Sequence, residues 1–202
     1  MSTTVHTIAA RAGVDVARLE AAYREVLLAI GEDPDREGLR DTPRRAAAAW
    51  QEFLDTQAER LSATFTHQTT GNSYVLVCGI DCWTLCEHHL LPFRLTLAVA
   101  YLPTGGQVLG LSKLARIVAH HARRLQLQER LCDEVADDLT RYSGSPDIAV
   151  WAEGEHLCMS MRGVRATGAR TVTEVLRGRL RTDTATTARL MTAAGVGRRP
   201  TL

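Results

Sequence analysis

The chain has 202 residues, of which 45% are hydrophobic and 23% are charged, and its formal net charge is +1. This length suits one globular domain with a small extension and allows a sizeable core, whereas the near-neutral charge argues against nucleic acid or an anionic membrane as a partner. No stretch approaches the 18 apolar residues of a membrane span and the first residues show no secretory signal, so we expect a cytoplasmic protein with reduced thiols.

Two helices are predicted in the first third of the chain. Asp15 is a candidate N-cap, the apolar residues that follow recur at helical spacing, and Gly31 ends the pattern. Thr42 is a second cap, followed by Pro at the first helical position, and an Ala-rich helix runs to about Leu54. Residues 55–72 are polar and weakly patterned, which predicts a long loop.

The middle of the chain changes from strands to helices. Residues 73–83 and 94–103 read as two strands flanking a turn with the sequence "CEHH". Helical periodicity begins at Ser112, and a second helical pattern runs to Leu139.

Residues 148–161 and 170–178 read as two further strands, and the tail after Arg181 is expected to be partly helical or frayed. The order of elements predicts an α+β fold with a largely antiparallel sheet. We expect an N-terminal helical extension and loop over residues 1–72, a core over 73–180 and a tail over 181–202.

The stretch "CEHH" carries the first candidate metal ligands. Cys86 and His89 are close enough in sequence to bind one ion from a tight turn, and Cys158 is the candidate for a third ligand. Cys82 and Cys78, four and eight residues before Cys86, compete for that place, although free cysteines are commonly small buried hydrophobes. Three protein ligands and an open position are typical of catalytic zinc, which lowers the pKa of a bound water to about 7. The same ligand set also suits iron.

The pattern of residues 148–161 favours Cys158. If the strand is regular, His156, Cys158, Ser160 and Arg162 share one face and apolar residues share the other. A polar row on a buried sheet is costly unless it serves a site. The alternative is an ordinary solvated face.

A candidate anion site lies at the start of the helix predicted from Ser112. Ser112, Lys113 and Arg116 stand where free backbone N–H groups and the helix dipole favour an anion, although Ser112 also suits a plain N-cap. Lys113 is the only lysine among the 24 basic residues. Gln128 and Glu129 follow, and a buried Glu can accept two hydrogen bonds from a guanidine-like edge such as that of guanine. The alternative for Glu129 is a solvated helix position.

Seven stretches together match one known family. They cover roughly residues 15–180 in the right order, and their combination is specific although no single stretch is: "DPDREGLRDTPRR", "CEHHLLPF", "AYLP", "VLGLSKLARIV", "ARRLQLQERL", "GEHLCMSMRGVR" and "TVTEVLRG". On these residues the chain resembles GTP cyclohydrolase I, the zinc enzyme that opens the imidazole ring of GTP.

The resemblance implies the tunnelling fold, an antiparallel sheet with two helices on one side, preceded by N-terminal helices. It implies a homodecamer of two stacked pentamers with active sites shared between subunits. It also implies Zn²⁺ as the cofactor, GTP as the substrate, and roles for twelve residues in four groups. The metal ligands would be Cys86, His89 and Cys158. The acid/base pair would be His88 and His156. The residues holding the triphosphate would be Arg45, Ser112, Lys113, Arg116 and Arg162. Those holding the guanine edge would be Gln128 and Glu129.

The implied reaction begins with attack of a metal-activated water on C8 of the purine. An imidazole protonates the departing nitrogen, and formate is released. The ribose then opens, rearranges and closes onto the freed amine. The product is 7,8-dihydroneopterin triphosphate, the entry to folate and other pterins, and a deazapurine pathway would use the same first reaction.

Two other functions compete with this reading. A catalytically silent paralogue could serve as a regulatory or structural ring subunit, but it need not retain all six of Cys86, His88, His89, Glu129, His156 and Cys158. A different zinc hydrolase such as a nucleoside deaminase would use an H-x-E motif with P-C-x-x-C. The chain has no C-x-x-C.

Overall fold

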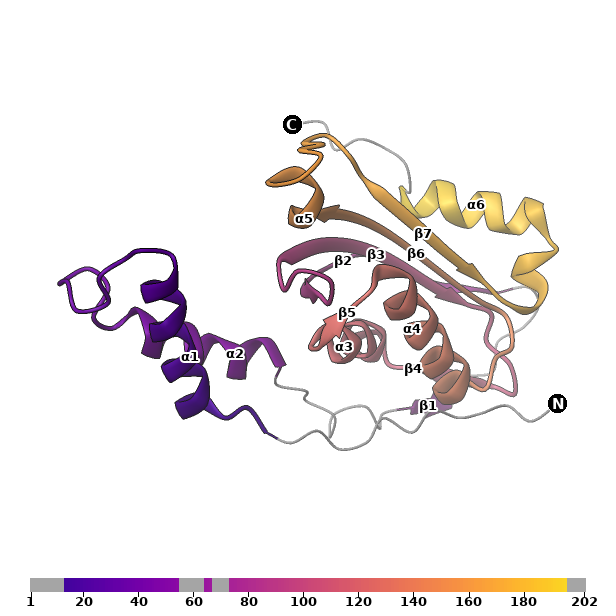
Figure 1. Cartoon of the computed structure of the whole chain (residues 1–202). Coiled ribbons are helices and arrows are strands. Elements are labelled where there is room, and N and C mark those ends of the chain that lie inside the picture. The colour runs from indigo at the N-terminus through magenta and orange to yellow at the C-terminus, as the bar shows by residue number, and fades with distance from the viewer. Residues whose placement is uncertain (1–12, 55–63, 67–72, 196–202) are drawn as a thin grey trace, which may run out of the picture. The chain divides into compact units, whose positions relative to one another are not determined.

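The computed structural model describes residues 13–54, 64–66 and 73–195 (Figure 1). The chain divides into two compact units, Met1–Asp55 and Thr56–Leu202. The long loop expected over residues 55–72 lies outside the described residues except for Thr64–Thr66, which forms the short strand β1.

The first unit consists of two helices, α1 (Val16–Ala29) and α2 (Thr42–Leu54), as the sequence predicts. The carboxylate of Asp15 accepts a hydrogen bond from the backbone N–H of Arg18 at 3.0 Å and so caps α1. The indole of Trp50 on α2 donates to the hydroxyl of Tyr23 on α1, which ties the two helices together.

The second unit is built on a five-stranded sheet with the order β5-β2-β3-β6-β7. Its strands are β2 (Val75–Cys86), β3 (Pro92–Tyr101), β5 (Leu125–Gln126), β6 (Ile148–His156) and β7 (Thr171–Leu176). All neighbours are antiparallel except β2 and β5. A separate small sheet pairs β1 with β4 (Gln107–Leu109).

Helices cover both faces of this sheet (Figure 1). On one face, α3 (Leu111–Ala122) and α4 (Gln128–Ser143) bury the larger core, to which alternate strand residues such as Leu97 and Val150 contribute. On the other face, α6 (Thr184–Ala194) packs through Leu190 against Ala98 and Trp151. The predicted α+β fold, with an antiparallel sheet and two helices on one side, is confirmed. In the described part of the tail, Thr184–Ala194 are helical and packed.

The prediction of one continuous strand over residues 148–161 is wrong. Strand β6 ends at His156, and Leu157–Ser160 form a single helical turn, α5, in which the N–H of Met161 donates to the carbonyl of Leu157 at 3.0 Å. The helical turn ends the two-residue alternation, so Cys158 does not lie on a strand face with His156.

The three cysteines of β2 do not share one regular face either. The register of β2 against β3 shifts between Val77 and Ile80, where Gly79 has a φ of 72°. A left-handed glycine is typical of a β-bulge. Cys78 is consequently exposed and Cys82 half-buried, whereas Cys86 is buried at the end of the strand.

A buried histidine joins α3 to α4. His121 on α3 lies between two carboxylates one turn apart on α4, with Nε2 2.9 Å from Oδ2 of Asp138 and Nδ1 3.3 Å from Oε2 of Glu134. Burial alone lowers the pKa of His121, but the hydrogen bond to Asp138 and the negative charges of Asp138 and Glu134 outweigh it, so its pKa is raised above the ordinary value. The protonated imidazole therefore stabilises the packing of the two helices.

This pair of contacts predicts a pH-dependent stability. A raised native pKa means that the contribution of His121 is fully present below the ordinary histidine pKa of about 6.5 and is lost as the pH rises through the raised value. We expect the stability advantage of the wild type over a His121→Asn variant to shrink above pH 6.5, measured by thermal unfolding at fixed protein concentration. A constant or growing difference would contradict the assignment of the charge.

Candidate active site

The "CEHH" turn closes on itself at the end of β2. The N–H of Cys86 donates to the carbonyl of Leu91 at 2.9 Å, and the N–H of Leu90 donates to the carbonyl of Cys86 at 2.8 Å. Leu90 adopts a left-handed conformation, with a φ of 56°. A leucine there is strained and persists only where surrounding contacts hold it. The turn thus presents Cys86, His88 and His89 on one rigid loop.

The acidic residue of "CEHH" is an anchor for this loop. The backbone N–H of Glu87 donates to the carbonyl of Gln126 on β5 at 3.2 Å, and its carboxylate forms an ion pair with Arg130 on α4. Arg130 in turn donates to the side chain of Gln126 at 2.9 Å and to the carbonyl of Leu125 at 3.0 Å. Sequence analysis did not identify Glu87 or Arg130, because these contacts join three separate segments.

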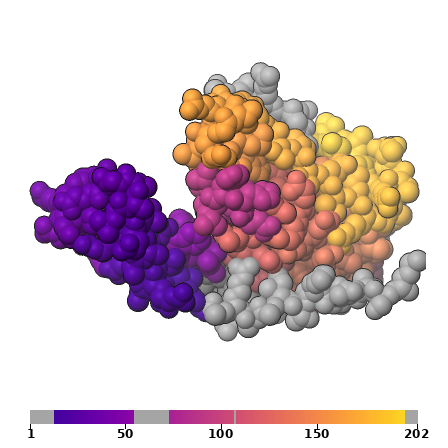
Figure 2. Space-filling model, in the orientation of Figure 1, coloured from indigo at the N-terminus to yellow at the C-terminus, as the bar shows by residue number. Residues whose placement is uncertain are grey.

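The pairing of β3 with β6 brings the segment that contains His156 and Cys158 next to the "CEHH" turn. Phe93, just after the turn, stands opposite His156 in register. The chain then turns into α5, so that Cys158 faces the loop at residues 86–91. Figure 2 shows the orange segment containing α5 directly against the magenta β2–β3 turn at the surface.

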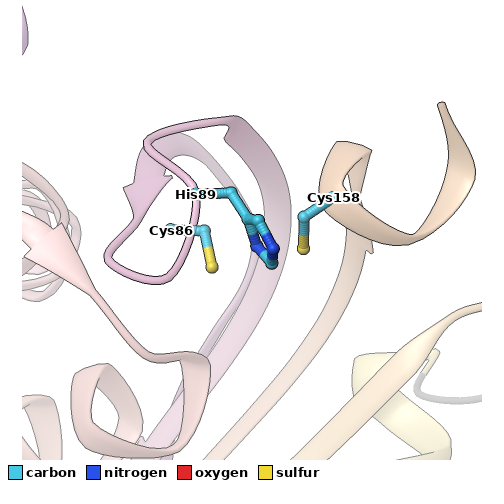
Figure 3. A group of neighbouring side chains, drawn as sticks. All are labelled: Cys86, His89 and Cys158. Atoms are coloured by element: carbon cyan, nitrogen blue, oxygen red, sulfur yellow. The ribbon is translucent and has the colours of Figure 1, made fainter. Parts of the chain in front are cut away.

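Cys86, His89 and Cys158 form a cluster in which the ligand atoms all lie within 4.8 Å of one another. Their side chains point toward a common centre (Figure 3). Tetrahedral zinc with Zn–S bonds of about 2.3 Å requires sulfur atoms about 3.8 Å apart, so small side-chain rotations bring this set to bonding distance. It is the one His/Cys/Asp/Glu cluster with metal-binding geometry in the part of the chain that the structure describes.

The thiol chemistry of the cluster fits a metal. Burial raises the pKa of the Cys158 thiol, and the adjacent Cys86 raises it further. The neutral form of the Cys158 thiol is thus favoured without a cation, whereas a bound dication deprotonates coordinating thiols. The two rival cysteines, Cys78 and Cys82, lie outside the cluster. Burial raises the pKa of Cys82 to about 12, and it does the same for Cys132 in the core, as expected of small buried hydrophobes.

Two further polar groups border the cluster. Nδ1 of His88 lies 3.8 Å from Sγ of Cys86, and a guanidinium nitrogen of Arg162 lies 3.0 Å from Nε2 of His89. Of the two adjacent histidines, only His89 belongs to the metal-binding group. Arg162 is also exposed, so it can offer its charge to an anion beside the cluster.

The imidazole of His156 is held in a fixed orientation by two neighbours. Its ring stacks on Phe93 with centroids 4.3 Å apart and an interplanar angle of 10°, and its Nε2 lies 2.9 Å from Oε1 of Gln128. Burial lowers the pKa of His156, opposed by the negative charge of Glu129 nearby. The imidazole is therefore neutral near pH 7 and available as a base.

The candidate phosphate residues of α3 are not brought to the cluster within one chain. Gly110 is the N-cap of α3 and no side chain caps this end, so the N-cap role considered for Ser112 is wrong. Lys113 is only 3% exposed, and its Nζ lies 4.2 Å from the ring centroid of Tyr142. Tyr142 stands fourteen positions after Gln128 on α4, about 21 Å at 1.5 Å per residue.

Arg45, Arg116 and Glu129 also stand apart from the Cys–His–Cys cluster in the contacts described for them. Arg45 belongs to the first unit, on α2, where it donates to Thr42 at 3.2 Å and lies 3.8 Å from Asp41. Arg116 is exposed on α3. Glu129 is likewise exposed, on the first turn of α4.

Comparison with known proteins identifies the family. The sequence model of the family described as GTP cyclohydrolase I matches residues 19–195. The chain belongs to the GTP cyclohydrolase I family. A relative from Hyperthermus butylicus, named GTP cyclohydrolase 1, is 49% identical over 84% of this chain and 86% of its own length. Relatives of the same name from Thermoanaerobacter pseudethanolicus and Streptomyces coelicolor are 47% and 49% identical, over 88% and 85% of this chain and 96% and 87% of their own lengths.

This GTP cyclohydrolase I family member is therefore an enzyme of that type, with a Cys–His–Cys cluster suited to a metal ion. In the part of the chain that the structure describes, no helix has the length and apolar character needed to cross a membrane.

The cluster predicts how metal content responds to mutation. Cys158→Ala removes one of three donors, and we expect the purified protein to fall from about one metal ion per chain to almost none. Cys78→Ala, at an exposed cysteine outside the cluster, is the matched control and should keep its metal. Inductively coupled plasma mass spectrometry measures both. Normal metal content in Cys158→Ala would rule out the ligand assignment.

Proposed function

We propose that this chain hydrolyses the imidazole ring of GTP, releases formate and rearranges the remainder to 7,8-dihydroneopterin triphosphate. The observation that carries the proposal is the cluster of Cys86, His89 and Cys158 with two histidines, His88 and His156, beside it. That set can hold a metal ion and also offers two imidazoles for acid/base work, in a chain that belongs to the GTP cyclohydrolase I family. We assign catalysis to residues 73–180, with Arg45 contributed by the extension over residues 1–72.

The proposed metal is Zn²⁺, held by Cys86, His89 and Cys158. Two thiolates and one imidazole suit zinc, and three protein ligands leave a fourth position for water or substrate. When bound, zinc supplies Lewis acidity that makes water a better nucleophile at neutral pH.

The two remaining histidines are proposed as the acid/base pair. His88 is exposed and His156 is half-buried, so the two imidazoles differ in their exposure to solvent. A neutral imidazole accepts a proton during attack on C8, and an imidazolium donates one to the departing ring nitrogen. Each role requires a group that changes charge near pH 7, which histidine provides.

The proposed substrate contacts fall into two groups. Arg162 and Glu129 lie near the cluster, since Arg162 contacts His89 and the charge of Glu129 reaches His156. Lys113 packs against Tyr142 near the other end of α4, about 20 Å from Gln128 along the helix, and Ser112 and Arg116 belong to the same end of α3 as Lys113. We therefore propose that each site combines the cluster of one copy with the α3 end of another, with Arg45 joining the triphosphate.

The sheet supports assembly into a ring. Within the described residues, β5 covers β2 only at Leu85 and Cys86, and β7 pairs only with β6. Trp83 on β2 and Val172 on β7 are 62% and 57% exposed. Unpaired edges on opposite sides of a sheet can join head to tail, and such joining closes into a ring when the rotation allows. We propose a homodecamer of two stacked pentamers.

We place this enzyme in the cytoplasm, at the entry to folate and other pterins or to a deazapurine. All five cysteines are free thiols, which suits a reducing compartment.

The reaction is tested directly by its products. Zinc-loaded protein incubated with GTP should release formate and dihydroneopterin triphosphate in equal amounts, as detected by mass spectrometry. His88→Ala should keep its zinc and lose about 10²- to 10⁴-fold in turnover, because it removes an acid/base group and no ligand. Loss of zinc in that variant would mean that the two histidines have exchanged roles. Absence of turnover in zinc-loaded wild type would favour a silent subunit.

The shared site is tested by mixing two inactive variants. His88→Ala damages the metal half and Lys113→Ala the phosphate half, so co-expression at equal levels should restore activity at roughly a quarter of the sites. A mixture of His88→Ala with His156→Ala damages the same half twice and should stay inactive. If the first mixture forms mixed oligomers but remains inactive, each site belongs to one chain.

A further inference from the structure

The side chain of Gln128 is buried in the sheet. It is the first residue of α4 and is 1% exposed. Its Nε2 donates two hydrogen bonds, to the carbonyl of Ala152 at 3.2 Å and to the carbonyl of Thr171 at 3.0 Å. Backbone carbonyls only accept hydrogen bonds, so these two contacts fix which end of the amide is nitrogen.

The fixed amide determines the proton position on His156. Oε1 of Gln128 lies 2.9 Å from Nε2 of His156 and can only accept. Nε2 must therefore carry the hydrogen, and in the neutral ring Nδ1 keeps the lone pair. Within the described residues, Nδ1 has no hydrogen-bond partner of its own.

We propose that Gln128 is a positioning residue that holds His156 as the Nε2–H tautomer and leaves Nδ1 to exchange protons with the substrate. The inference rests on the proposed function, because it concerns the histidine assigned there as an acid/base group. It differs from the role expected for Gln128 from the family resemblance, a contact with the guanine edge. Both amide hydrogens already bind backbone carbonyls, so the side chain of Gln128 has no donor left for a base.

Two neighbours make this arrangement rigid. Phe93 stacks on the imidazole and fixes the plane of the ring. Gly154 leaves room for the amide, since a Cβ at that position would lie 2.3 Å from Oε1 of Gln128. Strand β3 contributes Phe93, strand β6 contributes Gly154 and helix α4 contributes Gln128. None of these three residues has to contact the substrate.

The tautomer defines a balanced proton path. Nδ1 accepts a proton from the attacking water, and the ring becomes an imidazolium with hydrogens on both nitrogens. The same Nδ1 hydrogen is then donated to the ring nitrogen that leaves C8, which restores the neutral Nε2–H form. Oε1 of Gln128 accepts the Nε2 hydrogen throughout and stabilises the cationic form.

The wild-type protein tests the tautomer without any activity measurement. We would label the histidine rings with ¹⁵N, assign His156 by its loss in His156→Gln, and record long-range ¹H–¹⁵N correlations above pH 7. We expect Nε2 to show the shift of a protonated nitrogen and Nδ1 that of an unprotonated one. A protonated Nδ1 with a bare Nε2, or an even mixture of tautomers, would overturn the proposal.

Variants then separate positioning from base contact. Gln128→Met keeps the length but removes the acceptor, and Gly154→Ala displaces the amide; both should mix the tautomers and lower kcat by about tenfold or more with little change in KM for GTP. Gln126→Met removes another buried amide and should leave the His156 tautomer unchanged. A raised KM with normal kcat would assign Gln128 to guanine instead.

These outcomes remain distinct from failure of the proposed function. If wild-type protein does not convert GTP, the reaction is wrong, and the ¹⁵N spectrum still decides whether Gln128 sets the tautomer. If a variant does not fold, the wild-type spectrum alone decides.

Discussion

The antiparallel register between β3 and β6 is the constraint on which the site depends. It sets Phe93 opposite His156, and from that pair the chain runs in one direction to the turn carrying Cys86 and His89 and in the other to Cys158. A slip of one residue would turn every side chain of β6 to the other face. Both strands have apolar side chains that are buried in the core. A slip would expose these side chains and bury polar groups, so it is prevented. Core packing thereby determines the spacing of Cys86, His89 and Cys158.

Helix α4 makes contacts with the sheet at its first residue and with α3 further along. Its first residue, Gln128, is hydrogen-bonded into the sheet beside His156, while Glu134 and Asp138 hold His121 of α3 further along. The last turn carries Tyr142 beneath Lys113. One helix therefore fixes the metal end and the cationic end relative to each other. Along α4 these two ends are about 21 Å apart.

Sequence reasoning succeeded where the signal was local. Helical spacing found α1 and α2, and the compact "CEHH" turn and family stretches pointed to the residues that cluster in space. Cys158 was selected through a regular strand that in fact ends at His156, so a residue that does join the cluster was reached through a wrong geometry. The pairing of Glu87 with Arg130 and the bonds of Gln128 join residues 24 to 43 positions apart. No periodicity or motif encodes such long-range polar contacts.

The composition of the chain has a practical consequence at Lys113. It is the only lysine, it is almost completely buried, and burial lowers the pKa of its amine. Reagents that acylate amines therefore have a single lysine target in this protein, and its reactivity depends on how tightly α3 packs over Tyr142. The extent of modification at that one residue would report on the opening of the α3–α4 interface, with no background from other lysines.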